Sequence, residues 1–208
     1  MANDYNRIAG FYDKLSRVVY QRSIINAQVF LIQLINNNNK ILLAGGGTGW
    51  ILEEISKLQK QNVQVVYVEK SSAMIKLAKK RKFENINVEF VEAAIEEYHT
   101  TEKFDVVFTA FLFDNFLKDK IDHVFSKLDG WLNQKGFWLY ADFVNNTFNK
   151  KNWQQLLLKT MYLFFKLTAK IETQELIDMH PYFQHNYTLI AQQFYYNKFI
   201  QAIAYRKN

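Results

Sequence analysis

Four glycines within five residues follow a short apolar run, and this stretch constrains the fold more than any other part of the chain. The apolar residues 41–44 lead into Gly45-Gly46-Gly47-Thr48-Gly49, and an amphipathic pattern begins directly afterwards. This order predicts a buried strand, a tight loop and the start of a helix. Such a loop brings bare backbone close to a ligand, and a helix N-terminus favours a negative group there.

The spacing of the glycines narrows the kind of ligand. Gly45, Gly47 and Gly49 read G-x-G-x-G, whereas the dinucleotide fingerprint G-x-G-x-x-G needs glycine where Trp50 stands. Glu69 ends the next predicted strand, about 20 residues after Gly49. A carboxylate there can accept hydrogen bonds from both hydroxyls of a ribose and disfavours a 2′-phosphate. The alternative is a surface glutamate at a strand end, but the upstream glycine loop favours a ribose-bearing ligand.

From residue 40 onward, strand-like and helix-like patterns alternate. This alternation implies parallel βαβ units with right-handed crossovers. Asp114, at the start of the last of these helices, is expected to be its N-cap. The predicted strands cover residues 40–44, 63–68, 86–91, 104–109 and 136–142, and the predicted helices cover 49–60, 71–82 and 114–128.

Both ends of the chain depart from this alternation. A helical pattern over 14–35 precedes the first strand, and a long apolar helix is predicted over 150–170. The chain then shows a short helix and a hairpin whose closing strand is expected to be antiparallel. No internal repeat or linker interrupts it, so a single domain over 1–208 is predicted, with an N-terminal helical cap (1–39) and a core (40–208). The last predicted elements are the helix 175–184 and the strands 187–195 and 198–206, linked at Tyr196-Asn197.

Composition excludes several classes of site. The chain has no cysteine, so disulfides, thiolate metal sites and cysteine nucleophiles are excluded. No apolar run reaches the roughly 18 residues of a membrane span, and the N-terminus lacks the layout of a signal peptide. We therefore expect a cytoplasmic protein. The net charge is +6, but the one tight basic run, residues 79–82, lies at a predicted helix end and complements the helix dipole there. A binding patch is the alternative.

In these motifs the chain resembles the class I S-adenosylmethionine-dependent methyltransferases. The matching pieces are GGGTG at 45–49, the strand that ends in Glu69, the segment around Ala94 and the two later strands. Residues 5–13 also look like the opening segment of quinone-type and other small-molecule methyltransferases. The resemblance implies a Rossmann-like α/β fold. Its seven-stranded sheet would have the order 3-2-1-4-5-7-6, with strand 7 antiparallel and helices on both faces.

The resemblance also implies the cofactor, S-adenosylmethionine, its product S-adenosylhomocysteine, and the residues that hold them. The glycine loop would hold the methionine end, Glu69 the ribose, and the residues after the second and third strands the adenine. Tyr5 and Tyr12 are further candidates as aromatic faces beside the sulfonium, with packing of the N-terminal helix as the alternative. The full set is Gly45, Gly46, Gly47, Thr48, Gly49, Glu69, Lys70, Ala93, Ala94, Ile95, Thr109, Ala110, Phe111, Tyr5 and Tyr12.

Two positions depart from the family pattern. Leu43 stands where an acid usually assists the amino group of the cofactor, and Ala94 stands where an acid usually binds the adenine amine. Each lost charged hydrogen bond could cost roughly 1.5–3 kcal/mol if nothing replaces it. Glu92 and Glu96 are candidates to replace the acid at position 94.

The sequence shows no clear catalytic residue. Methyl transfer from a sulfonium is an in-line displacement, in which positioning can supply on the order of 7–11 kcal/mol. Asp142, His123 and Tyr12 are weak candidates for a base or a contact residue. Asp114 and Asn115 lie near where metal ligands would be, but we predict no metal.

The acceptor is expected to be a small hydrophobic or aromatic molecule, because the apolar pattern of 150–170 suits the wall of such a pocket. Burial or a homodimer contact is the alternative for that helix. Cytosine C5 methylation is excluded because it needs a cysteine. An RNA or protein methyltransferase that uses the basic surface stays open, although nucleic acid is not favoured. A non-catalytic S-adenosylmethionine-binding protein also stays open.

Overall fold

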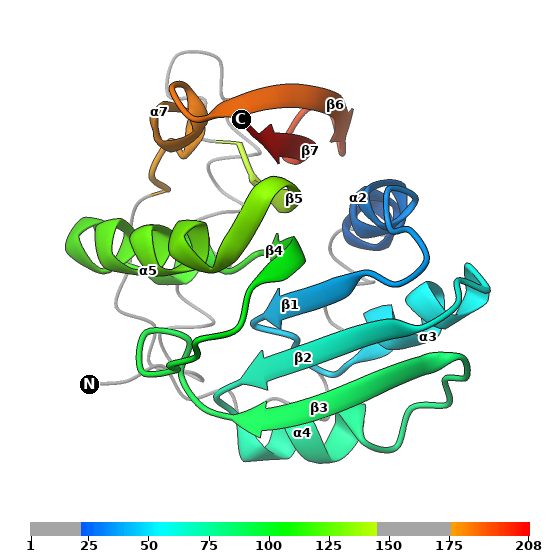
Figure 1. Cartoon of the computed structure of the whole chain (residues 1–208). Coiled ribbons are helices and arrows are strands. Elements are labelled where there is room, and N and C mark those ends of the chain that lie inside the picture. Colours follow the sequence, from blue (N-terminus) through cyan, green and yellow to red (C-terminus); the bar gives the residue numbers. More distant parts are fainter. Residues whose placement is uncertain (1–21, 145–175) are drawn as a thin grey trace.

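One seven-stranded sheet organises the molecule, and the computed structural model describes it through residues 22–144 and 176–208 (Figure 1). The strand order is β3-β2-β1-β4-β5-β7-β6. Neighbours from β3 to β5 are parallel, whereas β7 is antiparallel to both β5 and β6. The predicted order and the antiparallel seventh strand are thus confirmed. The strands are β1 (Lys40–Ala44), β2 (Val63–Glu69), β3 (Ile86–Glu92), β4 (Phe104–Ala110), β5 (Leu132–Phe143), β6 (Tyr187–Tyr195) and β7 (Ile200–Lys207).

Helices cover both faces of the sheet, and each face has its own hydrophobic core. On one face α2 (Ser23–Ile32), α3 (Trp50–Lys57) and α4 (Ser72–Ala78) pack over β1, β2 and β7. On the other face α5 (Lys118–Trp131) and α7 (His180–Phe183) pack over β4 and β5. The alternation of side chains along each strand divides the residues between the two cores. No helix within residues 22–144 or 176–208 has the length and apolarity to cross a bilayer.

The segment after β4 differs from the sequence prediction. The 3-10 turn η1 (Phe113–Asn115) follows the strand, and α5 begins only at Lys118, with Leu117 as its N-cap residue. Asp114 is therefore not the cap that the sequence predicted. Two contacts account for this difference. The Asn115 Nδ2 donates to the carbonyl of Phe111 at 2.9 Å and closes a separate turn, and the backbone N–H of Asp114 donates to Asp142, which is distant in sequence.

The C-terminal region also differs in detail. The predicted helix over 175–184 is reduced to the single turn α7, with Pro181 in its first turn, where a missing N–H is tolerated. Phe183 from this turn stacks on Tyr205 of β7, with ring centroids 4.1 Å apart. The tight link at 196–197 extends to Lys198, because all three residues have positive φ. The predicted helix over 150–170 and the first part of the N-terminal cap lie outside the described residues.

Candidate functional site

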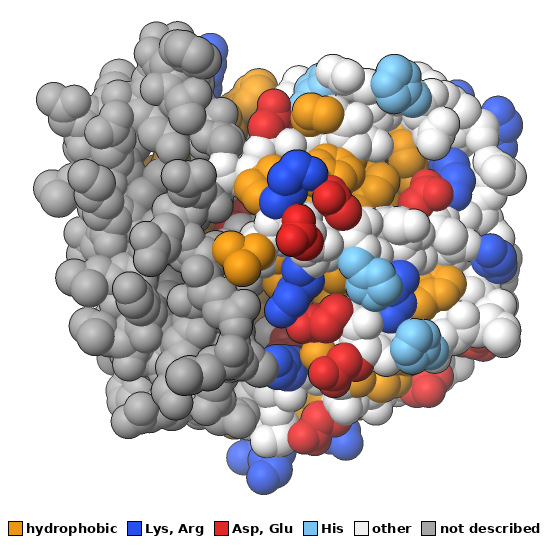
Figure 2. Space-filling view, turned by 90° about the vertical axis from the view of Figure 1, so that its left-hand side faces the viewer, with side chains coloured by type: hydrophobic (Ala, Val, Ile, Leu, Met, Phe, Trp, Pro, Cys, Tyr) orange, Lys and Arg blue, Asp and Glu red, His pale blue; other side chains and the backbone are white. Residues whose placement is uncertain are grey.

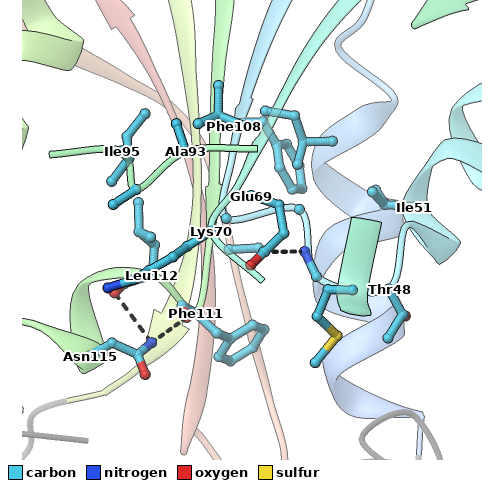
Figure 3. A pocket seen from close by; sticks show the side chains of 18 of the residues that line it. Thr48, Ile51, Glu69, Lys70, Ala93, Ile95, Phe108, Phe111, Leu112 and Asn115 are labelled. Atoms are coloured by element: carbon cyan, nitrogen blue, oxygen red, sulfur yellow. Dashed lines mark hydrogen bonds between the residues drawn. The ribbon is translucent and has the colours of Figure 1, made fainter. Parts of the chain in front are cut away.

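A pocket opens at the carboxyl ends of β1, β2 and β4, where parallel sheets of this kind bind ligands (Figure 3). Its floor is the glycine loop after β1. One wall comes from the ends of β2 and β3, and another comes from the segment after β4 and from α2. Lining residues include Gly45, Gly46, Gly47, Thr48, Glu69, Lys70, Ala93, Ala94, Ile95, Ala110 and Phe111 from the predicted set.

The aromatic ring of Tyr67 supports the glycine loop from below. The Tyr67 hydroxyl donates a hydrogen bond to the carbonyl of Gly47 at 2.6 Å. A Cβ added to Gly46 would lie 2.1 Å from the Tyr67 Cζ, so no side chain fits at that position. The loop can therefore approach a ligand with bare backbone on one side while its other side rests on a fixed ring.

Gly49 begins α3 and brings it against α4. Its φ is +76°, a left-handed conformation that favours glycine, and an added Cβ would lie 2.5 Å from the Cβ of Ala78. The contact between Gly49 and Ala78 thus fixes the C-terminal end of the glycine loop, just as Tyr67 fixes its middle. This packing directs the N-terminus of α3 towards the pocket, where it favours a negative group.

Glu69 ends β2 beside the loop and is 9% exposed. Its Oε2 accepts a hydrogen bond from the Gly47 N–H at 2.9 Å (Figure 3). Its Oε1 accepts a hydrogen bond from the Ser71 N–H at 2.8 Å. Burial raises the pKa of Glu69, while these backbone hydrogen bonds act in the opposite direction. The carboxylate therefore ties the glycine loop to the start of α4, and each oxygen keeps a second lone pair for a ligand.

Arg81 ties the loop to the end of α4. Its Nε donates to the carbonyl of Thr48 at 3.0 Å, and its Nη1 lies 3.6 Å from the Oε2 of Glu53. The basic run 79–82 follows α4 rather than forming its last turn, because the helix ends at Ala78. Arg81 thus supports the pocket structurally. This role differs from both sequence interpretations of the run, a solvated helix end and a binding patch.

The residues that follow β3 form an apolar wall of the pocket. Ala94 and Ile95 are buried and line the pocket, and Lys70 lines it as well (Figure 3 labels Ile95 and Lys70). Glu96 also lines the pocket, but its Oε1 is paired with the Lys120 Nζ at 3.4 Å. Of the two candidates to replace the acid missing at position 94, only Glu96 reaches the described lining.

The wall after β4 is apolar and aromatic. Phe111, Leu112 and Phe116 line it together with Asn115, and Phe111 packs on Phe143 with ring centroids 5.0 Å apart. Figure 3 shows Phe111 and Leu112 on the same side of the pocket as Asn115. A flat or apolar group entering here would meet rings and methyl groups rather than charges.

Gly49 is absent from the pocket lining, and Thr109 and Asp142 lie away from it. Thr109 is fully buried and its Oγ1 accepts a hydrogen bond from the Trp138 Nε1 at 2.9 Å, so it does not line the pocket as expected. Asp142 is 3% exposed and points to the α5 side, where the backbone N–H groups of Phe143 and Asp114 donate to it. Both differ from the expectation because alternate residues of a strand face opposite sides of the sheet.

Asp142, which is buried, and Asp114 of η1, which is half-buried, form an acidic pair. Burial, and then the neighbouring charge of Asp114, raise the pKa of Asp142 well above its usual range. Burial likewise raises the pKa of Asp114 to about 7. The buried Tyr140 lies near the same charges, and its pKa is raised by burial first and by Asp142 second. Two like charges in such a place favour a shared proton.

Sequence reasoning missed Gln28, which lines the pocket from α2. Its side chain is 7% exposed and has no hydrogen-bond partner among the residues that the structure describes. Burying an unpaired amide costs about 1–3 kcal/mol. The available signal was a glutamine within an otherwise apolar helical stripe, next to Ala27 and one turn before Leu31 and Ile32.

Comparison with known proteins shows a similarity to methyltransferases. Residues 41–136 match a family model described as a methyltransferase domain. The chain is 28% identical over 156 residues to a malonyl-[acyl-carrier protein] O-methyltransferase of Halalkalibacterium halodurans, which covers 69% of this chain and 55% of that protein. It is 33% identical over 91 residues to a carboxy-S-adenosyl-L-methionine synthase of Nautilia profundicola, over 42% of this chain and 38% of that protein. The chain thus spans about half the length of these relatives, or less.

Residues 41–136 thus match a methyltransferase domain, and the chain is similar to S-adenosylmethionine-dependent methyltransferases. Its fold also matches a solved structure of magnesium protoporphyrin IX methyltransferase from Synechocystis with bound S-adenosylhomocysteine. The TM-score is 0.66 at 13% identity, over 95% of this chain and 87% of that chain. At this identity the likeness concerns the fold.

The remaining candidates do not meet the pocket of this methyltransferase domain. His123 is exposed on α5 and is not part of the lining. Tyr5 and Tyr12 lie outside the described residues. Within the described part of the chain, no group of three or more His, Asp or Glu side chains is placed to hold a metal ion.

Proposed function

We propose that the protein binds S-adenosylmethionine and transfers its methyl group to a small hydrophobic or aromatic acceptor by in-line displacement. The observation that carries this proposal is a single pocket with two kinds of wall. The glycine loop and Glu69 form one side, and the apolar segment after β4 forms the other. A nucleoside and an apolar acceptor can therefore meet in one space.

The nucleoside side suits each part of the cofactor. Glu69 has lone pairs left for the two ribose hydroxyls after its bonds to the Gly47 and Ser71 N–H groups. The buried wall of Ala94 and Ile95 suits the flat adenine, and the N-terminus of α3 suits the carboxylate of the methionine end. When bound, the cofactor supplies the electrophilic methyl group.

The acceptor side supports transfer by orientation and exclusion of water. Phe111, Leu112 and Phe116 present apolar surface to an acceptor. An aromatic face near a sulfonium also attracts its positive charge. Within the described lining, the carboxylates are Glu69 and Glu96, and both already have partners. An acceptor that ionises readily fits this arrangement best, and a role for Asp142 as a base stays a prediction.

The substrates of two similar proteins favour an acceptor group of small size, whether free or carried on a protein. One acts on malonyl-[acyl-carrier protein] and the other on magnesium protoporphyrin IX. The described part of the face in Figure 2 gives no support to RNA binding, because acidic and basic side chains are interspersed there. The basic patch that nucleic acid binding requires is not seen on that face. The cytoplasmic location inferred from the sequence stays a prediction.

Calorimetry with S-adenosylhomocysteine tests the cofactor site. Glu69→Ala should weaken binding roughly 10- to 100-fold, because it removes a charged acceptor from the ribose. Glu92→Ala is the matched control, since Glu92 lies beside Glu69 in register at the end of β3 but outside the pocket lining. Absence of binding by the unmodified protein would refute the proposal, and equal affinity of the two variants would refute the ribose role of Glu69.

A turnover assay then tests the acceptor class. Methyl-donor consumption would be measured with phenols, quinols, apolar carboxylic acids, peptides and tRNA as acceptors. We expect turnover on an apolar small molecule, with little dependence on salt. Activity on tRNA that falls steeply with salt would instead favour the RNA alternative. Binding of the cofactor without turnover on any class would favour a non-catalytic binding protein.

A further inference from the structure

The α2 side of the pocket carries one polar group that the fold itself does not use. Gln28 and Ile24 are one helical turn apart and both line the pocket. The Gln28 side chain is 7% exposed, and no described residue hydrogen-bonds to it. The other buried residues of α2 are the apolar Ala27, Leu31 and Ile32. A buried amide without a partner is rare in native proteins, so a ligand group is expected to complete it.

The side chain of Leu43 offers a ligand no hydrogen-bond acceptor. Leu43 is apolar, lines the pocket and belongs to the same core cluster as Ala27 of α2. The methionine end of the cofactor brings an ammonium group, which requires an oxygen acceptor when it is removed from water.

The carboxylates of the described lining already have hydrogen-bond or ion-pair partners. Glu69 accepts hydrogen bonds from Gly47 and Ser71, and Glu96 is paired with Lys120. The Asn115 amide is also engaged, because its Nδ2 donates to the carbonyls of Phe111 and Leu112. Gln28 thus has a side-chain oxygen that accepts no hydrogen bond from any residue that the structure describes.

We infer that Gln28 binds the amino-acid end of S-adenosylmethionine, with its Oε1 accepting a hydrogen bond from the α-ammonium group. This inference rests on the proposed function. An amide has both an acceptor and donors, so its Nε2 can also donate to the adjacent α-carboxylate of the same ligand.

A pair of nucleosides tests the inference. S-adenosylhomocysteine carries the amino-acid end, whereas 5′-methylthioadenosine lacks it but keeps the ribose and adenine. Gln28→Leu should reduce affinity for S-adenosylhomocysteine roughly 10-fold or more by calorimetry, because a hydrogen bond to a charged group is lost. Affinity for 5′-methylthioadenosine should be unchanged. Gln28→Glu, which restores a carboxylate, should bind S-adenosylhomocysteine at least as tightly as the unmodified protein.

Gln33→Leu is the matched control, because it makes the same substitution at the exposed end of the same helix. If Gln28→Leu folds poorly, Gln28→Met gives the same comparison with a side chain of similar length. Unchanged affinity of the Gln28 variants for S-adenosylhomocysteine would overturn the inference, as would equal losses for both nucleosides. Failure of the unmodified protein to bind either nucleoside would instead refute the proposed function.

Discussion

Gly46 and Gly47 are adjacent in the loop but have different reasons to be glycine. A Cβ on Gly46 would meet the Tyr67 ring at 2.1 Å, whereas a Cβ on Gly47 would meet no atom within 4 Å. Gly47 instead has a φ of +62°, which other residues adopt at a modest energetic cost. Steric contact constrains one position, and backbone conformation constrains the other.

Alanine substitutions separate these two reasons. Gly46→Ala should lower the free energy of unfolding by about 1–3 kcal/mol or more, because the Tyr67 ring must move. It should also weaken cofactor binding, because that ring holds the carbonyl of Gly47. Gly47→Ala should lower the free energy of unfolding by only about 1 kcal/mol. Urea denaturation measures both, and equal losses for the two variants would contradict this explanation.

The sequence pattern predicted the glycine loop and Glu69 because their spacing is typical of one backbone arrangement, a strand, a tight loop and a helix followed by a second strand. They did not predict which side of the sheet Thr109 and Asp142 face. That choice depends on how each strand sits in the sheet, and one residue of shift reverses it. Gln28 was missed because a glutamine on a helix is ordinarily assigned to solvent. Only the packing of α2 over β7 shows that it is buried.

At the scale of elements, the packing of α3 against α4 depends on one contact. Gly49 starts α3 with a φ of +76°, and its added Cβ would lie 2.5 Å from that of Ala78 near the end of α4. The glycine loop lies directly before this contact. A change in the distance between the two helices would therefore move the pocket floor.

A double-mutant cycle tests this contact. Gly49→Ala should destabilise the protein by about 2–4 kcal/mol, through left-handed strain and overlap with Ala78. Ala78→Gly alone should cost about 1 kcal/mol as a glycine in a helix. The double variant should be more stable than the sum of the two losses predicts, because the overlap is relieved. Losses that simply add in thermal or urea unfolding would mean that the two positions are independent.

Element boundaries were predicted well where the pattern is long and less well where side chains cap turns. The strands β1 to β4 match because each is rich in apolar residues, many of them β-branched or aromatic. The start of α5 was misplaced because Asp114 looks like a cap in sequence. In the structure Asp142, distant in sequence, instead receives the backbone N–H of Asp114. Contacts of this range are not encoded in local propensity.

At the scale of the whole molecule, the acidic pair of Asp114 and Asp142 links stability to pH. The pKa of Asp114 is raised to about 7 and that of Asp142 is raised as well, both chiefly by burial. The folded chain therefore keeps protons that the unfolded chain releases above its ordinary carboxyl pKa of about 4. The stabilisation is complete below that value and is lost as pH rises through about 7.

The free energy of unfolding should accordingly fall between about pH 5 and about pH 8, by up to about 1.4 kcal/mol per pH unit for each proton retained. In Asp114→Asn the fall should be smaller, because Asp142 loses its like-charged neighbour. Urea titrations of both proteins across this range make the comparison. The buried Glu69 has a raised pKa in both, so its contribution cancels. Identical pH profiles would show that the two aspartates do not share a proton.

The position of β7 has a consequence for how the chain acquires its shape. β7 follows β6 in sequence but lies between β5 and β6 in the sheet. During synthesis β5 therefore presents an open edge while β6 is already exposed and has no partner in its final place. Neither edge can form its final hydrogen bonds until β7 has been synthesised and inserts between them. If β6 paired with β5 earlier, that pairing would have to break first. Closure of the sheet is thus a late, long-range event, and the interval before it is when this protein is most exposed to aggregation.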